Sequence, residues 1–513
     1  MADKMEAEEP MQMDEDGEEM IGDGDEDSDY EDVEGEDEDE GESGEEGDDS
    51  DDDEDEGILG DDKVRAKPKT KEEKLKKLGV EVKNGESSKS KAKKVPKPKK
   101  AYLPGMQMKE GESLVCDESA YVTLHTFTTI APCLSFDIIP DSLGPDRTKF
   151  PLTSYVVGGT QAQRSHANHI IVMKLSNVYK TLPKASDDEL SSDESDNDGM
   201  DDSDMQSKKP ELNAAVIPHH GCINRLRFNF VGDKPLVSTW SELGKVSIWD
   251  VTTPLRALDS VDLIQEYIKS KDKPKPIFTF KGHRGEGFAM DWSQTMPGVF
   301  ATGDTTKFIH IWRPNESSWI VDQRPFSAHT ASVEDIQWSP NEQHVFASCS
   351  VDKSIRIWDA RVKSNKGAMI TKENAHDSDV NVIHWNRKDP FIASGGDDCA
   401  LKVWDLRSFS SGESVAEFRH HHKGPICSVE WSPNESSVLA TAGEDDQVAI
   451  WDLAVERDPE EKADDDMQDV PPQLMFVHQG QQDIKEVHWH PQIPGTLIST
   501  AATGFNIFKP INA

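Results

Sequence analysis

Cysteine is scarce in this sequence, and the six cysteines show no paired spacing. We therefore expect neither a disulfide framework nor a C-x-x-C zinc site. No stretch approaches the ~20 consecutive apolar residues that a membrane-spanning helix needs. The segment Met1–Glu6 also has no apolar core of the kind found in a cleavable signal. Together these absences predict an intracellular protein in a reducing compartment.

Catalytic signatures are missing as well. The sequence has no H-E-x-x-H, G-x-S-x-G or P-loop motif. The histidines and aspartates that could act as catalysts stand at offsets fixed by an internal repeat, and catalysis would require one copy to differ from its siblings. We therefore expect no enzymatic activity, no cofactor and no metal.

The internal repeat is marked by four tryptophans, each nine residues after a histidine. The pairs recur every 46 or 47 residues, and they are His283 with Trp292, His329 with Trp338, His376 with Trp385, and His422 with Trp431. A second tryptophan series keeps step with the first, and four of its five members precede an aspartate, as in Trp358-Asp359. A period of this length, built from short alternating apolar runs, is typical of β-propeller blades.

Six units of three strands and their turns can be recognised. They span residues 216–252, 277–314, 325–361, 372–407, 417–453 and 474–510. A degenerate seventh unit is expected at 120–180, where 132–137, 155–159 and 170–173 read as its strands. Because closure of the ring removes sheet edges that would pair with other chains, we predict an all-β, seven-bladed propeller.

Spacings within the unit resemble those of the WD-repeat family. A serine or threonine stands ten residues before each tryptophan of the second series, and in three copies an aspartate stands six residues before it, at Asp352, Asp398 and Asp445. The resemblance implies that His, Ser/Thr, Asp and Trp of one blade form a hydrogen-bond chain. The pairs Trp312-Arg313 and Phe508-Lys509 depart from the pattern, so these two blades are expected to depend more on packing.

Charge is spread very unevenly along the chain, whose formal net charge is −43. Residues 1–62 carry 35 acidic residues and one lysine, whereas residues 63–100 carry 16 basic and 4 acidic residues. The segments 186–204 and 456–469 contribute −10 and −6. We predict a disordered acidic tail at 1–62, a basic linker at 63–103, and a nearly balanced propeller at 104–513 that carries these two acidic loop insertions.

The acidic segments have two interpretations. They keep the protein soluble, or they form a polyanion that captures a very basic protein and screens it from nucleic acid. A neighbouring lysine run favours the second interpretation because it resembles a nuclear import signal read by importin; a solvated linker that pairs with the tail is the alternative. The lysines of this run are Lys93, Lys94, Lys97, Lys99 and Lys100.

Several further segments extend the resemblance beyond the repeat. They are the run from Asp146-Arg147-Thr148 through Gly158-Gly159-Thr160, the stretch from Lys281-Gly282-His283 to Phe288, and the stretch from Asp452-Leu453-Ala454 to Pro459. These segments resemble the glutamate-rich WD-repeat proteins of ribosome assembly, which are similar to the retinoblastoma-associated histone-binding propellers. Nearly the whole chain from about Tyr102 onward takes part in the resemblance.

This resemblance carries implications for structure, location and partners. It implies a short N-terminal helix and residence in the nucleus and nucleolus. It also implies a chaperone that escorts a basic ribosomal protein of the large subunit, universal protein three, to pre-ribosomal particles, with histones as an alternative client. We further expect a monomer that contacts no membrane and reads no nucleic-acid sequence.

The WD-repeat resemblance also implies a binding rim on the narrow face of the propeller. Six carboxylates there would attract the Lys and Arg side chains of a client, and Phe288 would offer an apolar or cation–π contact. The alternative is that these charges only keep the face soluble. The rim residues are Glu286, Phe288, Ser332, Glu334, Val351, Asp379, Asn381, Asp397, Cys427, Glu444, Asp483 and Lys485.

A competing function is that of a substrate receptor of a cullin-type ubiquitin ligase. Its sequence mark, Trp-Asp-x-Arg at a blade end, occurs at residues 358–361 and 404–407. On this interpretation Arg361 and Arg407 would contact the ligase adaptor. Arginine at this position also serves as an ordinary turn or helix-end residue, and the motif occurs in WD-repeat proteins of many functions.

Overall fold

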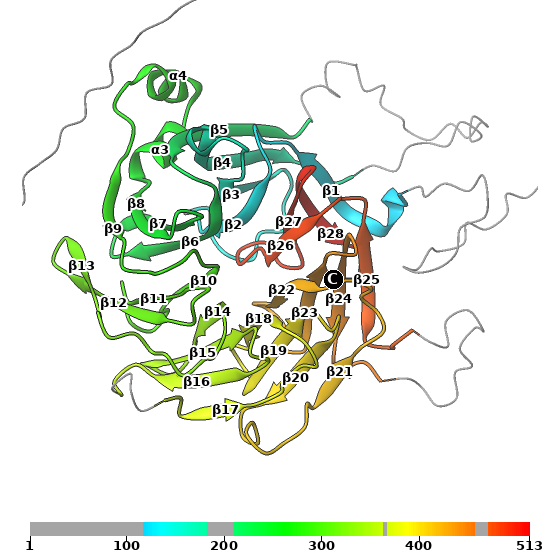
Figure 1. Cartoon of the computed structure of the whole chain (residues 1–513). Coiled ribbons are helices and arrows are strands. Elements are labelled where there is room, and N and C mark those ends of the chain that lie inside the picture. Colours follow the sequence, from blue (N-terminus) through cyan, green and yellow to red (C-terminus); the bar gives the residue numbers. More distant parts are fainter. Residues whose placement is uncertain (1–115, 182–208, 363–366, 457–469, 513) are drawn as a thin grey trace, which may run out of the picture. The chain divides into compact units, whose positions relative to one another are not determined.

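The computed structural model describes residues 116–181, 209–362, 367–456 and 470–512. Within these ranges the chain forms seven antiparallel sheets of four strands each, which follow one another around a ring (Figure 1). The predicted all-β, seven-bladed propeller is confirmed. No helix of the described residues is long and apolar enough to cross a membrane.

Each blade runs from an inner strand at the centre of the ring to an outer strand at its edge. The first blade contains β2 (Cys133–Ile139), β3 (Leu152–Thr160), β4 (Asn168–Val178) and β5 (Glu211–His219). The second contains β6 (Ile223–Val231), β7 (Lys234–Ser241), β8 (Lys245–Asp250) and β9 (Pro276–Phe280). The third contains β10 (Ala289–Trp292), β11 (Phe300–Gly303), β12 (Ile309–Asn315) and β13 (Ser318–Val321).

Blades four to six repeat this order without change. The fourth contains β14 (Val333–Trp338), β15 (Val345–Ser350), β16 (Ile355–Asp359) and β17 (Ile370–Lys372). The fifth contains β18 (Val380–Trp385), β19 (Phe391–Gly396), β20 (Leu401–Asp405) and β21 (Ala416–Phe418). The sixth contains β22 (Ile426–Trp431), β23 (Val438–Gly443), β24 (Gln447–Asp452) and β25 (Leu474–Gln479).

The seventh blade joins both ends of the described chain. It contains β26 (Ile484–Trp489), β27 (Leu497–Ala501), β28 (Gly504–Pro510) and, as its outer strand, β1 (Tyr121–Phe127). We had predicted 120–180 as one unit, but β1 pairs with β28, so only residues from β2 onward belong to the first blade. Likewise β25, placed by the sequence with residues 474–510, is the outer strand of the sixth blade. The repeat is therefore offset from the blades by one strand.

Helical structure is confined to short connections. Two helices, α3 (Thr252–Ala257) and α4 (Val261–Lys269), link β8 to β9 and were not anticipated from the sequence. Two single turns of 3-10 helix, η2 (Glu118–Ala120) and η3 (Ser165–Ala167), precede β1 and β4. The expected N-terminal helix, the acidic tail, the basic linker and most of both acidic insertions lie outside the described residues.

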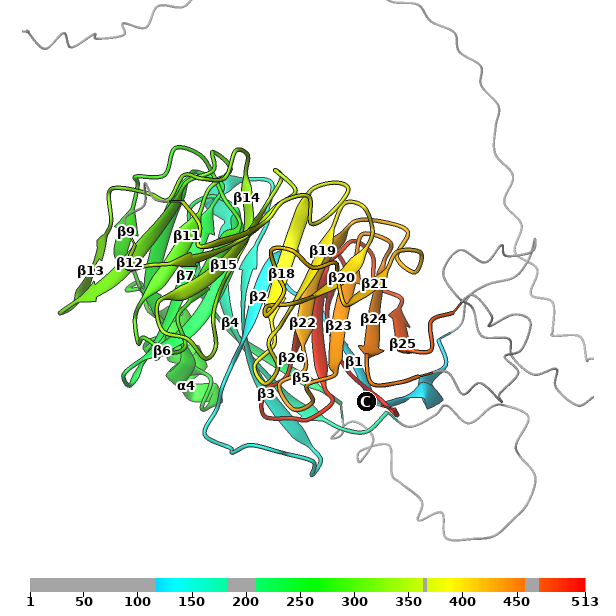
Figure 2. The same cartoon turned by 90° about the horizontal axis from the view of Figure 1, so that it is seen from below.

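The core consists of seven apolar clusters, one between each pair of neighbouring blades. In the fourth blade, for example, strand β14 buries Val333, Ile336 and Trp338 against residues of the third blade. The cluster between the seventh and first blades includes Phe505 and Phe136. No blade buries its two faces alone, so removal of area from water ties each blade to both neighbours. Figure 2 shows the blades side by side around the ring.

Polar chains inside the blades are confirmed in the three copies that the sequence marked. In the fourth blade His329 lies 2.9 Å from Asp352 and 2.7 Å from the Ser348 hydroxyl, which accepts the indole N–H of Trp358 at 2.8 Å. The fifth and sixth blades contain the same chain, through His376 and His422. These polar groups are thus satisfied inside the sheet rather than available for catalysis.

The third blade also contains a complete chain, which corrects the prediction for Trp312-Arg313. His283 lies 2.9 Å from Asp304 and 2.8 Å from the hydroxyl of Thr302, and the indole N–H of Trp312 donates to that hydroxyl at 2.9 Å. Asp304 stands eight residues before the tryptophan rather than six, because this turn is two residues longer. The fixed offset therefore missed it.

The seventh blade also replaces the polar chain rather than losing it. The Tyr121 hydroxyl lies 2.8 Å from Nδ1 of His478, and the Asn506 amide lies 3.1 Å from Nε2 of the same ring. Phe508, in the position of the missing tryptophan, stacks on His478 with ring centroids 3.9 Å apart. Packing is thus important here as predicted, but polar contacts from β1 and β28 accompany it.

Candidate functional site

The predicted rim residues lie where the chain enters each inner strand and at the turns between the second and third strands. Glu334, for example, is the second residue of β14, and Asp397 follows β19 directly. Four of the six rim carboxylates are exposed, whereas Glu334 and Asp379 are half-buried. Because every inner strand starts at the same end of its blade, these positions share one face of the ring.

Three of the carboxylates gather at the fourth and fifth blades. Burial raises the pKa of Glu334, and the carboxylates of Asp379 and Asp397 raise it further, against the lowering effect of the Arg225 guanidinium. Burial and Asp397 likewise raise the pKa of Asp379. The Asn381 amide donates to Asp397 Oδ1 at 2.8 Å. This cluster thus contains more negative charge than its surroundings neutralise, and a cation bound there would relieve the repulsion.

The remaining rim residues are more nearly compensated. In the seventh blade, Lys485 forms an ion pair with Asp483 at 2.6 Å. Burial lowers the pKa of Lys485, but Asp483 together with Cys427 and Glu444 reverses this and raises it. At the third blade, Glu286 accepts a hydrogen bond from the Asn224 amide at 2.9 Å. The uncompensated acidity of the rim is therefore centred on the fourth and fifth blades.

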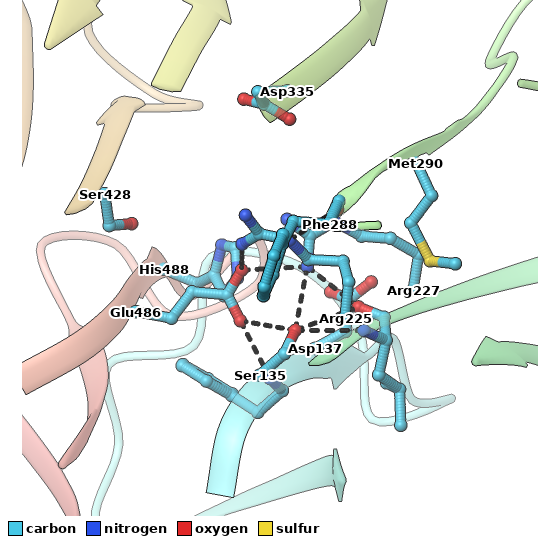
Figure 3. Close-up of polar contacts among 12 residues, drawn as sticks. Ser135, Asp137, Arg225, Arg227, Phe288, Met290, Asp335, Ser428, Glu486 and His488 are labelled. Atoms are coloured by element: carbon cyan, nitrogen blue, oxygen red, sulfur yellow. Dashed lines mark hydrogen bonds and ion pairs between the residues drawn. The ribbon is translucent and has the colours of Figure 1, made fainter. Parts of the chain in front are cut away.

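Phe288 takes part in the rim mainly through its backbone. Its side chain is half-buried, and its carbonyl accepts a hydrogen bond from Arg225 Nε at 2.9 Å. Figure 3 shows the Phe288 ring beside the guanidinium groups of Arg225 and Arg227. Among the other predicted rim positions, Ser332, Val351 and Cys427 are half-buried as well.

A charged network fills the channel behind the rim, and its hub is the buried carboxylate of Glu486 (Figure 3). Arg225 and Arg227 each lie 2.9 Å from Glu486 Oε1, and the Ser135 hydroxyl donates to Oε2 at 2.8 Å. Burial alone would raise the pKa of Glu486, but Arg227, His488 and Arg225 hold it well below its usual range.

His488 is the second cation of this network. Its Nδ1 lies 2.7 Å from Glu430 and its Nε2 lies 3.5 Å from Glu486. Burial alone would lower the pKa of His488, but these two carboxylates reverse the effect and raise it to about 10. His488 is therefore protonated at neutral pH, and the channel contains matched pairs rather than free negative charge.

Side chains of the channel also join neighbouring blades through backbone groups. The carboxylates of Asp137, Asp291 and Glu430 accept the N–H of Phe228, Trp338 and Trp489 at 2.8, 2.7 and 3.1 Å. At a second level, Asp335 accepts the N–H of Ile383 and Glu486 that of Phe136. These contacts fix each inner strand against the next and so hold the rim in register.

Sequence reasoning missed this network, although a signal was present. Polar or charged residues stand at alternate positions in the inner strands, as in Arg225 and Arg227 of β6 or Glu486 and His488 of β26. Alternation placed them on one face of each strand, facing the channel. Within the described residues, no group of three metal-ligating side chains is found.

The two arginines of the ligase hypothesis are exposed at equivalent places in the fourth and fifth blades. Arg361 forms a two-pronged ion pair with Asp359, with its closest contact at 2.7 Å, and Arg407 does the same with Asp405 at 2.6 Å. Each pair closes a local turn, which is the structural role of the Trp-Asp-x-Arg mark. The import lysines lie outside the described residues.

Fold and polar chains together define a class: this is a WD-repeat β-propeller with an acidic rim on one face. A model of the WD domain, G-beta repeat, matches residues 321–359, 367–405 and 412–452. A second model, described as the histone-binding protein RBBP4 or its equivalent in the CAF1 complex, matches residues 111–179. That match covers β1 to β4, the region in which the sequence repeat is weakest.

Relatives of nearly full length identify the family within this class. The chain is 44% identical to Protein HEAT STRESS TOLERANT DWD 1 of Arabidopsis thaliana over 84% of this chain and 95% of that protein. It is 41% identical to Ribosome assembly protein rrb1 of Schizosaccharomyces pombe, over 80% of this chain and 84% of that protein. It is also 41% identical to Glutamate-rich WD repeat-containing protein 1 of Dictyostelium discoideum, over 81% of this chain and 86% of that protein. The chain belongs to the glutamate-rich WD-repeat family.

Proposed function

We propose that this protein is a non-enzymatic chaperone for a highly basic ribosomal protein of the large subunit, universal protein three, which it delivers to pre-ribosomal particles. The name of its fission-yeast relative, Ribosome assembly protein rrb1, supports a place in ribosome assembly. We further propose that the protein acts in the nucleus and nucleolus as a monomer.

The observation that carries this proposal is the group formed by Glu334, Asp379 and Asp397. Mutual repulsion and burial raise the pKa of the first two, so the site is prepared for a cation that the protein itself does not supply. Lysine and arginine side chains of a client segment would neutralise the group, and Phe288 would offer its ring nearby. Ordered carboxylates of this kind also speed the encounter with a basic partner.

The direct test reverses charges on the rim of the full-length protein. Glu286, Glu334, Asp379 and Glu444 are changed together to lysine, and the matched control changes Glu36, Asp37, Glu38 and Asp39 of the acidic tail to lysine. Affinity for the purified ribosomal protein is measured by titration at several salt concentrations. We expect the rim variant to lose roughly tenfold or more in affinity and the tail variant to lose far less, because the rim is ordered and the tail is redundant.

Thermal unfolding of both variants establishes that the propeller is intact. Equal binding by the rim variant and the unmodified protein would contradict the rim assignment and place the site elsewhere in the chain. A stronger loss in the tail variant would assign capture to residues 1–62.

A histone is the alternative client, favoured by the match of residues 111–179 to the histone-binding model. The same titration with purified histones H3 and H4 distinguishes the two. An affinity for histones above that for the ribosomal protein, measured at equal salt, would reverse the order of the two functions.

A role as ligase substrate receptor is tested by the exposed arginines. Arg361→Ala with Arg407→Ala removes both ion pairs at the blade ends, and Arg324→Ala, an exposed arginine in another loop, serves as the control. Loss of co-purification with the ligase adaptor only in the double variant would support this role.

Nuclear import is tested separately in cells. Replacement of Lys93, Lys94, Lys97, Lys99 and Lys100 with alanine is expected to leave the protein in the cytoplasm, because importin recognition depends on ammonium contacts. An unchanged nuclear signal would show that import uses another route.

A further inference from the structure

A cleft of about 400 Å³ opens on the rim face between the second and third blades. One wall is the turn between β7 and β8, residues 242–245, and the other is the loop that leads from β9 to β10, residues 281–286. Gly244 has a φ of 69°, and a Cβ there would stand 3.1 Å from the Gly285 carbonyl oxygen. Backbone thus approaches backbone at the base of the cleft, and the longer side chains of the two walls are left to point outward.

Three basic side chains line this cleft, and all three are exposed. They belong to Lys245, Lys281 and Arg284. Within the described ranges none of the three has a carboxylate at ion-pair distance. The Arg284 guanidinium lies over the Phe308 ring, 4.9 Å from its centroid, and this contact orients it.

The carboxylates at the cleft edges are engaged by the protein itself. Glu242 accepts hydrogen bonds from the Cys222 N–H at 2.9 Å and the Ser165 hydroxyl at 3.4 Å. Glu286 accepts one from the Asn224 amide at 2.9 Å. They therefore stabilise the surrounding loops, while the three cations stay available to a ligand. The rim face thus has a basic sector at the second and third blades and an acidic sector at the fourth and fifth.

We propose that this cleft binds a short stretch of aspartate and glutamate residues from a partner protein. Three cations within one cleft can pair with successive carboxylates of an extended segment, and Arg284 offers two-pronged geometry. A nucleic acid fits less well, because its phosphate backbone requires a continuous basic stripe, whereas Glu242 and Glu286 border this cleft. With the acidic sector alongside, the face can hold segments of opposite charge side by side and so fix their orientation. This site does not depend on the proposed client.

The test uses the full-length protein and a fluorescent twelve-residue peptide of alternating glutamate and glycine. Binding is measured by anisotropy at low salt for the unmodified protein and two variants. The cleft variant combines Lys245→Glu, Lys281→Glu and Arg284→Glu. The control variant combines Lys234→Glu, Lys271→Glu and Lys275→Glu, which are exposed residues of the β6–β7 and β8–β9 connections, and it changes the net charge equally.

We expect peptide binding to weaken about tenfold in the cleft variant and to stay within about twofold in the control, because only the cleft variant replaces attractive contacts with repulsive ones. Carbodiimide coupling to the unmodified protein is expected to join peptide carboxylates to the amines of Lys245 and Lys281, as located by mass spectrometry. Equal weakening in both variants, or coupling spread over other lysines, would overturn the proposal. Tighter binding of a twelve-nucleotide uridine RNA, lost in the cleft variant, would replace it with a nucleic-acid site.

Discussion

The hydroxyl oxygen of Tyr121 lies 2.8 Å from Nδ1 of His478, although 357 residues separate them in the chain. Burial lowers the pKa of His478 to about 4, so the ring is neutral at physiological pH and its Nδ1 can accept the phenolic proton. This single contact attaches β1, the first strand, to β25 of the sixth blade. It therefore secures the joint at which the ring closes.

Removal of that hydroxyl should loosen the joint. We expect Tyr121→Phe to lower the free energy of unfolding by roughly 1–3 kcal/mol, because His478 loses its buried partner. Denaturant unfolding measures the change. Tyr155→Phe is the matched control, since no hydrogen bond joins the Tyr155 hydroxyl to any described residue, and equal effects in both variants would refute the assignment.

The third-blade polar chain gives a second stability prediction. Asp304→Ala should lower the free energy of unfolding by roughly 2–4 kcal/mol, because it leaves the buried His283 ring without its partner. Asp352→Ala in the fourth blade should have a similar effect, whereas Asp233→Ala at an exposed turn should change little. A near-neutral Asp304 variant would restore the original view that this blade relies on packing.

Protonation of His488 predicts a pH dependence with a definite sign. Its pKa is raised to about 10 in the folded state, against about 6.5 in the unfolded chain. Its contribution to stability is therefore complete below pH ~6.5 and declines as pH rises toward 10. The stability difference between the unmodified protein and His488→Gln should shrink over this window in denaturant titrations. His220→Gln, at an exposed site, should show no such trend.

The rim cluster predicts a salt dependence. Glu334→Gln, Asp379→Asn and Asp397→Asn together should flatten the fall of client affinity with ionic strength, because fewer charge pairs remain to be screened. The control changes Asp233, Asp259 and Asp272 of the second blade to asparagine and should keep the original slope. Parallel slopes for the two variants would show that the rim makes no ionic contact with the client.

Truncation separates the N-terminal segments from the ring. Deletion of residues 1–100 removes no strand of the propeller, so we expect one cooperative thermal transition to persist. Deletion of residues 1–127 also removes β1 and should lower or abolish that transition. Loss of the transition in the shorter deletion would show that the first 100 residues support the fold.

Periodicity was sufficient to predict the blade count, because the core depends on residues that recur in every copy. Each histidine and tryptophan of the repeat occupies a position that all blades share. The offset between repeat and blade was not predictable in this way, since the outer strands, such as β17 and β21, are only three residues long. The pairing of β1 with β28 joins segments too distant for any local pattern to report.

The candidate site was less accessible from sequence. Offsets located the rim positions, but they could not show that Lys485 neutralises Asp483 while Glu334 and Asp379 stay uncompensated. That difference depends on contacts between blades. The channel network illustrates the same limit, because Arg225 and Glu486 come from the second and seventh blades and meet only when the ring is closed.

The shared seventh blade also sets an order of events during synthesis. Strand β1 leaves the ribosome among the first ordered parts of the chain, yet its partner β28 is the last strand to be made. Until then the growing chain has an unpaired β1, and a chain that stops short of Gly504 has no partner for it at all. Unpaired strand edges are templates for association with other chains. A protein of this topology therefore becomes protected from aggregation only when its last strand is complete, and a truncated product is exposed to aggregation and degradation.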